Sequence, residues 1–105
     1  MAQPNLPAVT AIVVAAGASR RMGFDKLSYR LPDGRTVLET SCAALAAHPA
    51  ITQLVLVCGG NRAACEGIAA ACPKPCAVVQ GGATRADSVR NGLAAATGEL
   101  VAIHD

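Results

Sequence analysis

Short apolar runs alternate with helix-period segments along most of this chain. Four runs have the length of one buried strand, at residues 9–14, 54–58, 77–80 and 100–103. Such runs are too short for a globular helix, and their continuous apolar character is typical of strands covered on both faces. Three further segments have helical spacing, at about 36–48, 62–71 and 84–96. The alternation predicts an α/β fold with a doubly wound, mainly parallel sheet.

Local sequence signals mark the ends of the expected elements. Thr36 and Glu39 have the spacing of a capping box, in which each side chain satisfies a free backbone amide of the other, and they predict a helix start. Pro49 ends that helix, and Gly98 follows the last one as a C-terminal breaker. Ahead of the first helix, residues 27–31 are expected to be extended and residues 32–35 to form a turn.

The loop after the first run combines small residues with a high density of positive charge. Residues 15–19 are small enough for the backbone to pass close to a ligand, and a turn rich in free N–H groups can hold an anion. Arg20, Arg21 and Lys26 add three cations within seven residues. A solvated basic turn is one interpretation, because basic loops often only keep a protein soluble. The other is a loop that binds a polyphosphate.

Two familiar phosphate-binding motifs do not fit this loop. The dinucleotide fingerprint needs glycines at its first, third and sixth positions, but Ser19 and Met22 occupy the third and sixth positions counted from Gly17. The P-loop needs lysine directly after its second glycine, whereas Phe24 follows Gly23. The spacing therefore indicates a phosphate loop of another kind.

Three stretches far apart in sequence follow expected strands. They are the loop after residues 9–14, the Gly81-Gly82 pair after residues 77–80, and Asp105 after residues 100–103. Ligands of open parallel sheets bind outside the carboxyl ends of the strands. We therefore expect these three stretches to converge on one crevice.

The same stretches carry a family resemblance. Residues 15–23 with Lys26 look like the signature of nucleotidyltransferases that activate a sugar or alcohol phosphate with CTP or a related nucleotide. Residues 81–93 and 101–105 narrow this, because together with the first motif they resemble the 2-C-methyl-D-erythritol 4-phosphate cytidylyltransferase family over residues 9–105. The resemblance implies the N-terminal part of a Rossmann-like nucleotidyltransferase fold, with residues 1–8 as a lead-in and 9–105 as a CTP-binding part.

The resemblance also implies an activity and its participants. The family transfers CMP from CTP to 2-C-methyl-D-erythritol 4-phosphate, a sugar-alcohol phosphate, and releases pyrophosphate in non-mevalonate isoprenoid biosynthesis. Such transfer depends on positioning and on stabilising charge at the phosphates, so cations and a metal matter more than a strong base. The implied cofactor is Mg²⁺, which a carboxylate and phosphate oxygens commonly hold. The full-length enzyme is expected to be a homodimer.

Matching to the family motif assigns roles to individual residues. Arg21 and Lys26 would stabilise the transition state, and Asp105 would hold Mg²⁺. Arg20 is interpreted as an auxiliary phosphate contact or a solvated side chain, and His104 as a support for its neighbour rather than a ligand. The residues expected to bind the nucleotide are Ala15, Ala16, Gly17, Ala18, Ser19, Gly81, Gly82, Arg85 and Ser88.

The chain departs from the family pattern in three ways. Asp25 and Leu27 flank Lys26 where many relatives have proline and glutamine, and Ala83 stands where the family often has an acidic residue. Relatives also continue beyond the His-Asp element into an acceptor-binding half. We therefore expect residues 1–105 alone to leave an open sheet edge with an uncovered apolar face, and not to turn over substrate.

Other functions remain to be weighed against this one. Ribitol-5-phosphate and molybdopterin cytidylyltransferases share the chemistry, and a nucleotide-binding domain without catalysis would share the cradle. The presence of both Arg21 and Lys26 speaks against a mere binder. A redox domain of the Rossmann type is opposed by the glycine spacing and by Cys58-Gly59, which stands where an acidic residue would end the second strand.

Composition sets further bounds. The 105 residues allow one domain, and 52% of them are hydrophobic although Phe24 and Tyr29 are the sole aromatic residues, so the core must be built from aliphatic side chains. A net charge of +2 and the lack of a stacking aromatic series argue against nucleic-acid binding. The sequence has neither an apolar run of membrane-spanning length nor a signal or transit peptide, which predicts a cytoplasmic protein with no membrane partner.

Five cysteines are unusual in such a chain. None forms a C-x-x-C motif, and free cysteine behaves as a small buried hydrophobe. We expect structural thiols in a reducing compartment rather than a metal site. These residues are Cys42, Cys58, Cys65, Cys72 and Cys76.

Overall fold

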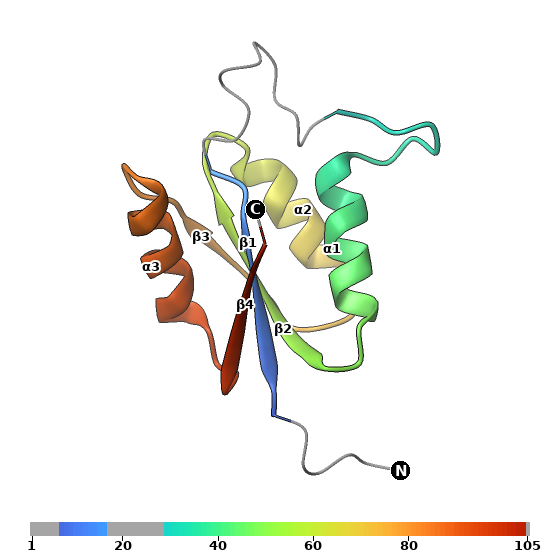
Figure 1. Ribbon diagram of the computed structural model, residues 1–105. Helices are drawn as coiled ribbons and strands as arrows, with labels where there is room; N and C mark the ends of the chain where they lie inside the picture. Colours follow the sequence, from blue (N-terminus) through green and yellow to red (C-terminus); the bar gives the residue numbers. More distant parts are fainter. Residues whose placement is uncertain (1–6, 17–28, 105) are drawn as a thin grey trace.

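The computed structural model describes residues 7–16 and 29–104 and shows one parallel sheet between helices (Figure 1). Strands and helices alternate along the described chain. The strand at 9–14 and the helix at 62–71 have the bounds predicted from the sequence. The elements in chain order are β1 Val9–Val14, α1 Val37–Ala47, β2 Ile51–Cys58, α2 Arg62–Ala71, β3 Cys76–Gln80, α3 Arg85–Ala95 and β4 Leu100–His104.

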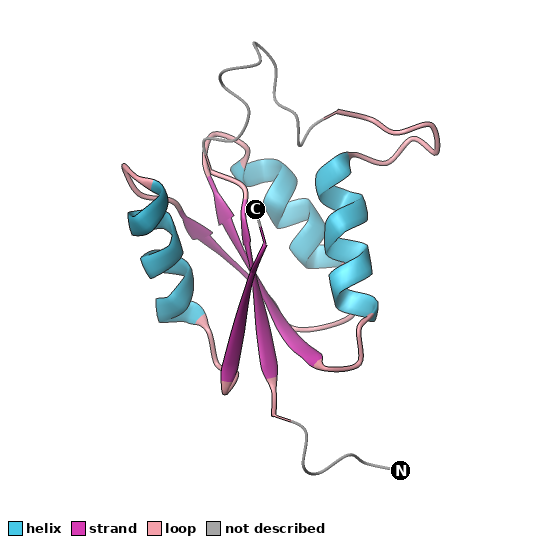
Figure 2. Cartoon of the chain, in the orientation of Figure 1, coloured by secondary structure: helices cyan, strands magenta, loops and turns pink. Residues whose placement is uncertain are grey.

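The strand order in the sheet is β3-β2-β1-β4, and every neighbouring pair is parallel. Helices α1 and α2 cover one face, and α3 covers the other (Figure 2). The chain moves outward from β1 to β3 and then crosses to the far side of β1 to form β4. This reversal makes the predicted doubly wound sheet and puts its switch point beside β1.

Alternate side chains of the central strands serve the two faces. On β1, Ala11 and Val13 belong to the core under α1 and α2, whereas Ile12 and Val14 belong to the core under α3. All four are nearly or fully buried. A strand covered on both faces has no polar side, so its sequence reads as a continuous apolar run.

The helix starts follow their caps. Thr36 and Glu39 form the predicted capping box: the Glu39 amide donates to Thr36 Oγ1 at 3.0 Å, and the Thr36 amide donates to Glu39 Oε1 at 2.7 Å. This arrangement lowers the pKa of Glu39, chiefly through the hydrogen bond from the Thr36 amide. In α3, Thr84 Oγ1 accepts from the Asp87 amide at 3.1 Å. Gly34 has φ of 88° in the turn between residues 32 and 35, a conformation that glycine adopts readily.

The start of β2 differs from the sequence prediction. The strand begins at Ile51, three positions before 54, although Gln53 is polar. The Gln53 side chain finds partners on other elements: its Oε1 accepts from Thr10 Oγ1 at 2.7 Å and from the Thr97 amide at 2.9 Å, and its Nε2 donates to the Ala95 carbonyl at 3.1 Å. Because these bonds satisfy the amide, a polar residue can sit inside the strand. Strands β3 and β4 each extend one residue beyond the prediction, to Cys76 and His104 respectively.

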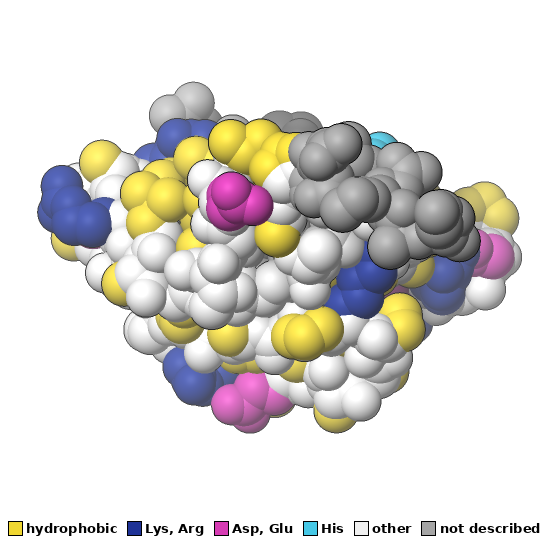
Figure 3. Space-filling model, turned by 90° about the horizontal axis from the view of Figure 1, so that it is seen from below, with side chains coloured by type: hydrophobic (Ala, Val, Ile, Leu, Met, Phe, Trp, Pro, Cys, Tyr) yellow, Lys and Arg dark blue, Asp and Glu magenta, His cyan; other side chains and the backbone are white. Residues whose placement is uncertain are grey.

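Strand β4 lies at the edge of the sheet described here. Its apolar side chains remain open to solvent, with Leu100, Val101 and Ile103 exposed to 53%, 37% and 46%. Leu93 on α3 is exposed to 46% on the same side of the sheet as the α3 core. The predicted open edge and uncovered apolar surface are therefore present in the described residues. At the end of the molecule where the strands begin, charged side chains of both signs are scattered among hydrophobic and polar ones (Figure 3).

The cysteines agree in part with the expectation that they are buried structural thiols. Cys42, Cys58 and Cys65 are buried, whereas Cys72 and Cys76 are partly buried. None of these five cysteines forms a disulfide in the described part of the chain. No group of three His, Cys, Asp or Glu side chains among residues 7–16 and 29–104 is arranged to hold a metal ion. In the same part of the chain, no helix has the length and apolar character needed to cross a membrane.

Two helix glycines offer a matched test of the packing. A Cβ on Gly92 of α3 would lie 2.8 Å from Ile12 Cγ2 and 3.0 Å from Val57 Cγ2, whereas a Cβ on Gly67 of α2 would meet nothing within 4 Å. We expect Gly67→Ala to raise the free energy of unfolding by about 0.5–1 kcal/mol through helix propensity. Gly92→Ala should lower it by about 1–3 kcal/mol, because overpacking outweighs that gain. Urea unfolding checks both, and equal shifts of the same sign would contradict the close approach of α3 to the sheet.

Candidate nucleotide site

A cavity of about 580 Å³ opens at the carboxyl ends of the strands, where β2 and β3 end and α2 and α3 begin. Glycines make up four of its lining positions, so much of its wall is bare backbone. Arg85 is the one charged side chain among the described residues that line it. The complete described lining is Ala16, Cys58, Gly59, Gly60, Gln80, Gly81, Gly82, Ala83, Thr84, Arg85 and Ser88.

Sheet hydrogen bonds fix the strand ends around this cavity. The Ala15 amide donates to the Val57 carbonyl at 2.8 Å, and the Gly81 amide donates to the Cys58 carbonyl at 2.8 Å. The ends of β1 and β3 are thus held on either side of β2. The expected donation from the Ala15 amide to a triphosphate is not supported, because that N–H already serves the sheet and the residue is 3% exposed.

The Gly81-Gly82 pair passes too close to its neighbours for side chains. A Cβ on Gly81 would lie 2.6 Å from the Ala16 Cβ and 2.9 Å from Ser88 Oγ. A Cβ on Gly82 would overlap the Cβ of Asp87. Glycine therefore lets this turn fit between the loop after β1 and the start of α3, with its backbone along the cavity.

Ser88 connects α3 to this turn. Its side chain is 3% exposed, and its Oγ accepts a hydrogen bond from the Gly82 amide at 3.1 Å. The amides of both glycines are thus engaged within the protein, while their carbonyl oxygens can still accept hydrogen bonds. Asn91 adds a second tie, since its Nδ2 donates to the Gln80 carbonyl at 3.0 Å. The turn is consequently positioned by α3 before any ligand arrives.

Two helix starts flank the cavity. Helix α3 presents Thr84, Arg85 and Ser88 from its first turns. Helix α2 follows Gly59-Gly60, and there the Gly59 amide donates to Asn61 Oδ1 at 2.9 Å. The amino ends of helices favour negative groups through their free amides and dipoles. The cavity is therefore suited to a polar ligand that carries negative charge.

The cavity brings together residues that were predicted from distant parts of the sequence. Ala16 from the loop after β1 and Gly81, Gly82, Arg85 and Ser88 from the β3–α3 region all line it. Ala16, the last described residue before 17–28, thus lies beside the Gly81-Gly82 turn, as predicted. The other predicted residues, Gly17, Ala18, Ser19, Arg21, Lys26 and Asp105, lie outside the described residues.

The third stretch ends on the other side of β1. His104 is paired in register with Val13, so β4 finishes beside β1 and away from the β2–β3 side that holds the cavity. The described lining contains no carboxylate. The carboxylate expected to hold Mg²⁺, that of Asp105, lies outside the described residues.

The sequence interpretation missed part of the lining. The sequence analysis predicts no ligand contact for Cys58, Gly59, Gly60 or Gln80, all of which line the cavity. Because β2 is a central strand, its carboxyl end lies inside the crevice, and the strand-end rule could have included it. Gln80 was harder to find, since its role depends on its Nε2 reaching the Cys58 carbonyl at 3.3 Å.

Replacing Ser88 by alanine tests the tie between α3 and the turn. We expect the Gly82 amide to lose its partner and the turn to loosen, which should weaken CTP binding about tenfold, in line with the roughly 1–3 kcal/mol cost of an unsatisfied buried group. Calorimetric titration of CTP measures the change. Ser41→Ala on α1, remote from the cavity, is the matched control. Unchanged CTP affinity in a folded Ser88→Ala protein would contradict the role of this contact.

Comparisons with known proteins point to one family. Residues 9–105 match the family described as IspD: 2-C-methyl-D-erythritol 4-phosphate cytidylyltransferase. The chain is 41% identical over 100 residues to the enzyme of that name from Aeromonas hydrophila, a match that covers 94% of this chain and 41% of the relative. It is 44% identical over 98 residues to the bifunctional enzyme IspD/IspF of Anaeromyxobacter dehalogenans, covering 92% of this chain and 25% of that protein.

A solved structure supports the same assignment. The crystal structure of 4-diphosphocytidyl-2C-methyl-D-erythritol synthase from Anaerococcus prevotii superposes with a TM-score of 0.73 at 27% identity, over 93% of this chain and 42% of that one. The chain thus spans about two fifths of the length of its single-function relatives. Because the family model matches residues 9–105, nearly the whole chain, the chain belongs to the 2-C-methyl-D-erythritol 4-phosphate cytidylyltransferase family.

Proposed function

We propose that this chain supplies the CTP-binding part of an enzyme that transfers CMP from CTP to 2-C-methyl-D-erythritol 4-phosphate with release of pyrophosphate. Residues 9–105 are the CTP-binding part, and residues 1–8 are a lead-in. The observation that carries the proposal is the glycine-walled cavity at the carboxyl edge of the sheet, where the loop after β1 meets the Gly81-Gly82 turn.

The turn supports a cytosine rather than a uracil. The amides of Gly81 and Gly82 donate to protein acceptors, so the backbone groups that this pair offers to a ligand are carbonyl oxygens. Cytosine carries an exocyclic amino group that donates hydrogen bonds, whereas uracil has a carbonyl oxygen at the same position. A uracil carbonyl facing a backbone carbonyl would leave both oxygen atoms without a hydrogen-bond donor, and this mismatch disfavours UTP.

The phosphate chemistry is assigned to residues of the family motif. Ala16 to Ser19 cradle the triphosphate, and Arg21 and Lys26 stabilise charge that develops on its oxygens during the in-line attack. Asp105 holds Mg²⁺, which when bound supplies further neutralisation of the phosphates. Arg85 lies at the start of α3, where it adds positive charge to the cavity wall. The functional enzyme is a homodimer in this proposal.

The acceptor is assigned from the family rather than from the cavity. Ribitol-5-phosphate and molybdopterin cytidylyltransferases would use the same nucleotide cavity, and no feature of the described residues favours either. The family assignment favours methylerythritol phosphate. A binder without catalysis would keep the cavity but would not need both Arg21 and Lys26.

A pyrophosphate-release assay tests the proposal. The intact protein, given CTP and Mg²⁺, should release pyrophosphate with 2-C-methyl-D-erythritol 4-phosphate and much less with ribitol 5-phosphate. UTP and GTP in place of CTP should give slower release. Faster release with ribitol 5-phosphate would overturn the acceptor assignment, and no release with any acceptor despite CTP binding would favour the non-catalytic alternative.

A further inference from the structure

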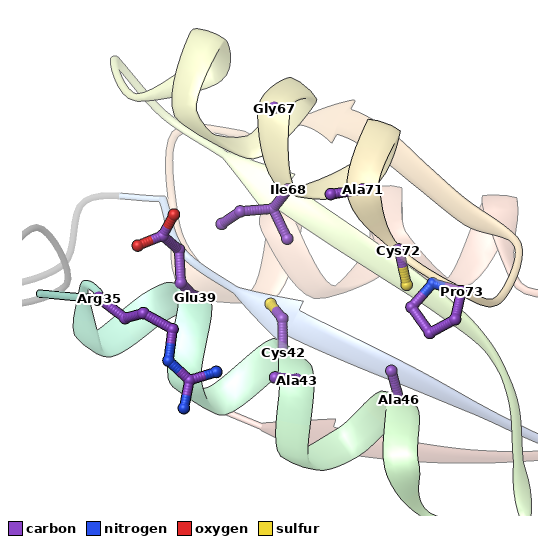
Figure 4. A pocket seen from close by; sticks show the side chains of 10 residues that line it. All are labelled: Arg35, Glu39, Cys42, Ala43, Ala46, Gly67, Ile68, Ala71, Cys72 and Pro73. Carbon is purple, nitrogen blue, oxygen red and sulfur yellow. The ribbon is translucent and has the colours of Figure 1, made fainter. Parts of the chain in front are cut away.

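A second hollow lies outside the nucleotide cavity, between α1 and α2 on one face of the sheet (Figure 4). Its volume is about 210 Å³, and most of its wall is apolar. An engineered cavity of about 150 Å³ is large enough to bind benzene, so this groove has room for one aromatic ring and its substituent. The groove is lined by Arg35, Glu39, Cys42, Ala43, Ala46, Gly67, Ile68, Ala71, Cys72 and Pro73.

Two sulfur atoms face this groove from different elements. Cys42 lies on α1 and Cys72 caps the end of α2, and both side chains point into the space between the helices (Figure 4). Cys42 is buried, whereas Cys72 is partly open to solvent. Sulfur is polarisable and makes favourable contacts with aromatic rings. Of the two, Cys72 is the thiol that a molecule entering the groove can reach.

Cys76, the first residue of β3, is the neighbour of Cys72. Burial raises the pKa of Cys76 to about 12, and the nearby Cys72 thiol adds to this both by its charge and by a side-chain hydrogen bond. Pro73, Lys74 and Pro75 join the two cysteines, and Lys74 Nζ ties this segment to the His48 carbonyl at 2.7 Å. The two sulfur atoms therefore interact within a segment that is fixed to the α1–β2 connection.

The charges at the mouth of the groove restrict what can enter. Arg35 Nε bonds Asp33 Oδ2 at 3.3 Å, and the Glu39 carboxylate lies at the same end of the groove. Arg30 also acts on the Glu39 carboxylate, so two carboxylates face two guanidinium groups here and no excess of positive charge is left to attract an anion. A neutral molecule is thus favoured over a charged one.

We propose that Cys72 and Cys76 form a reactive thiol pair that is oxidised by a small, uncharged, apolar disulfide bound in the groove between α1 and α2. The Cys72 thiolate attacks one sulfur of the bound disulfide, whose S–S bond breaks and releases one thiolate, which takes up a proton. Cys76 then loses its proton and attacks the Cys72 sulfur, which releases the second half of the reagent. Two protein thiols are oxidised to one disulfide, and the reagent disulfide is reduced to two thiols.

The order of attack follows from exposure and thiolate content. Cys72 borders the groove and solvent, and the other four thiols are more deeply placed or lie away from it. The raised pKa of Cys76 leaves little of it as thiolate at neutral pH, so it reacts second, once Cys72 holds the disulfide beside it. The pair thus differs from Cys42, Cys58 and Cys65, which are buried structural thiols.

The neutral aromatic reagent 2,2′-dithiodipyridine tests this pair in the folded, reduced intact protein. Release of pyridinethione is followed by absorbance, and the modified residues are located by peptide mass spectrometry. We expect a first phase that releases two pyridinethiones and leaves a Cys72–Cys76 disulfide with no pyridyl group attached. Cys76→Ser should stop after one and keep the pyridyl group on Cys72, and Cys72→Ser should lose the phase.

Three outcomes would overturn the proposal. They are a first phase that labels Cys42, Cys58 or Cys65, a Cys72→Ser protein that keeps the phase, and a stable pyridyl adduct on Cys72 in the unsubstituted protein. Circular dichroism confirms that each variant is folded before its rates are compared.

Entry through the groove has its own test. Ala43 lines the groove and Ala44 does not, although both are exposed on α1. Ala43→Phe should fill the groove and slow the first phase about tenfold, which corresponds to about 1.4 kcal/mol. Ala44→Phe should leave the rate unchanged. Equal rates in the two variants would show that the reagent reaches Cys72 by another route.

Discussion

Replacing Gly82 by valine is expected to raise the Michaelis constant for CTP at least about tenfold. The protein should stay folded, because overpacking of this size lowers the free energy of unfolding by roughly 1–3 kcal/mol. A Cβ at this position would overlap the Cβ of Asp87 and approach the Asp87 backbone carbon within 3.3 Å. The turn must therefore move away from α3, which separates the Gly82 amide from Ser88 Oγ and shifts the backbone carbonyl groups that we propose to accept from the base. Initial rates over a series of CTP concentrations measure the effect.

The control for this substitution is Gly67→Val on α2. Gly67 is exposed, an added Cβ meets nothing within 4 Å, and the residue does not line the nucleotide cavity. The control should keep the CTP Michaelis constant of the unsubstituted enzyme. If Gly82→Val is folded and saturates with CTP at the same concentration as the control, the Gly-Gly turn does not form part of the base site.

Replacing Lys26 by alanine is expected to lower the catalytic rate about 10²–10³-fold, with a smaller effect on nucleotide affinity. The reason is that a cation beside the phosphates gains most when charge develops on them in the transition state. Arg21→Ala should behave in the same way. Single-turnover rates and equilibrium binding of CTP separate the two effects.

Arg62→Ala provides the charge-matched control for Lys26→Ala. Arg62 lies on α2 and forms an exposed ion pair with Glu66 at 3.0 Å, so its loss also lowers the net charge by one without touching the cavity lining. Surface pairs of this kind contribute little to stability. A Lys26→Ala enzyme whose loss lies in CTP binding alone would show that the lysine anchors the ground state and does not act on the transition state.

Much of the fold follows from the sequence because each element carries its own signal. The runs at β1 and α2 are bounded by loop residues, and the Thr36–Glu39 spacing identifies the start of α1. The first part of β2 was missed because Thr52 and Gln53 are polar. Gln53 belongs in the strand through bonds to Thr10, Thr97 and Ala95, which come from three other parts of the chain. A local pattern contains no information about such distant partners.

The candidate site was predictable where a motif or the strand-end rule applies. Ala16 and the Gly81-Gly82 pair were expected to meet, and they line one cavity. From the sequence, Ser88 is expected only to bind the nucleotide, whereas in the structure its Oγ accepts a hydrogen bond from the Gly82 amide. The failed expectation for the Ala15 amide has a simple cause: the sheet hydrogen bonds run one residue past the end of β1 and use that amide first.

The most direct test of the account is ligand-dependent thermal unfolding of the intact protein with CTP, UTP, GTP or NAD in the presence of Mg²⁺. A ligand of the folded state raises the melting temperature by mass action. A free ligand concentration of 100 times the dissociation constant stabilises the folded state by about 2.7 kcal/mol. The account predicts a clear rise with CTP, smaller rises with UTP and GTP, none with NAD, and a much smaller CTP effect in Gly82→Val. Equal stabilisation by all four ligands, or a CTP effect of unchanged size in Gly82→Val, would contradict the placement of cytosine at the Gly81-Gly82 turn.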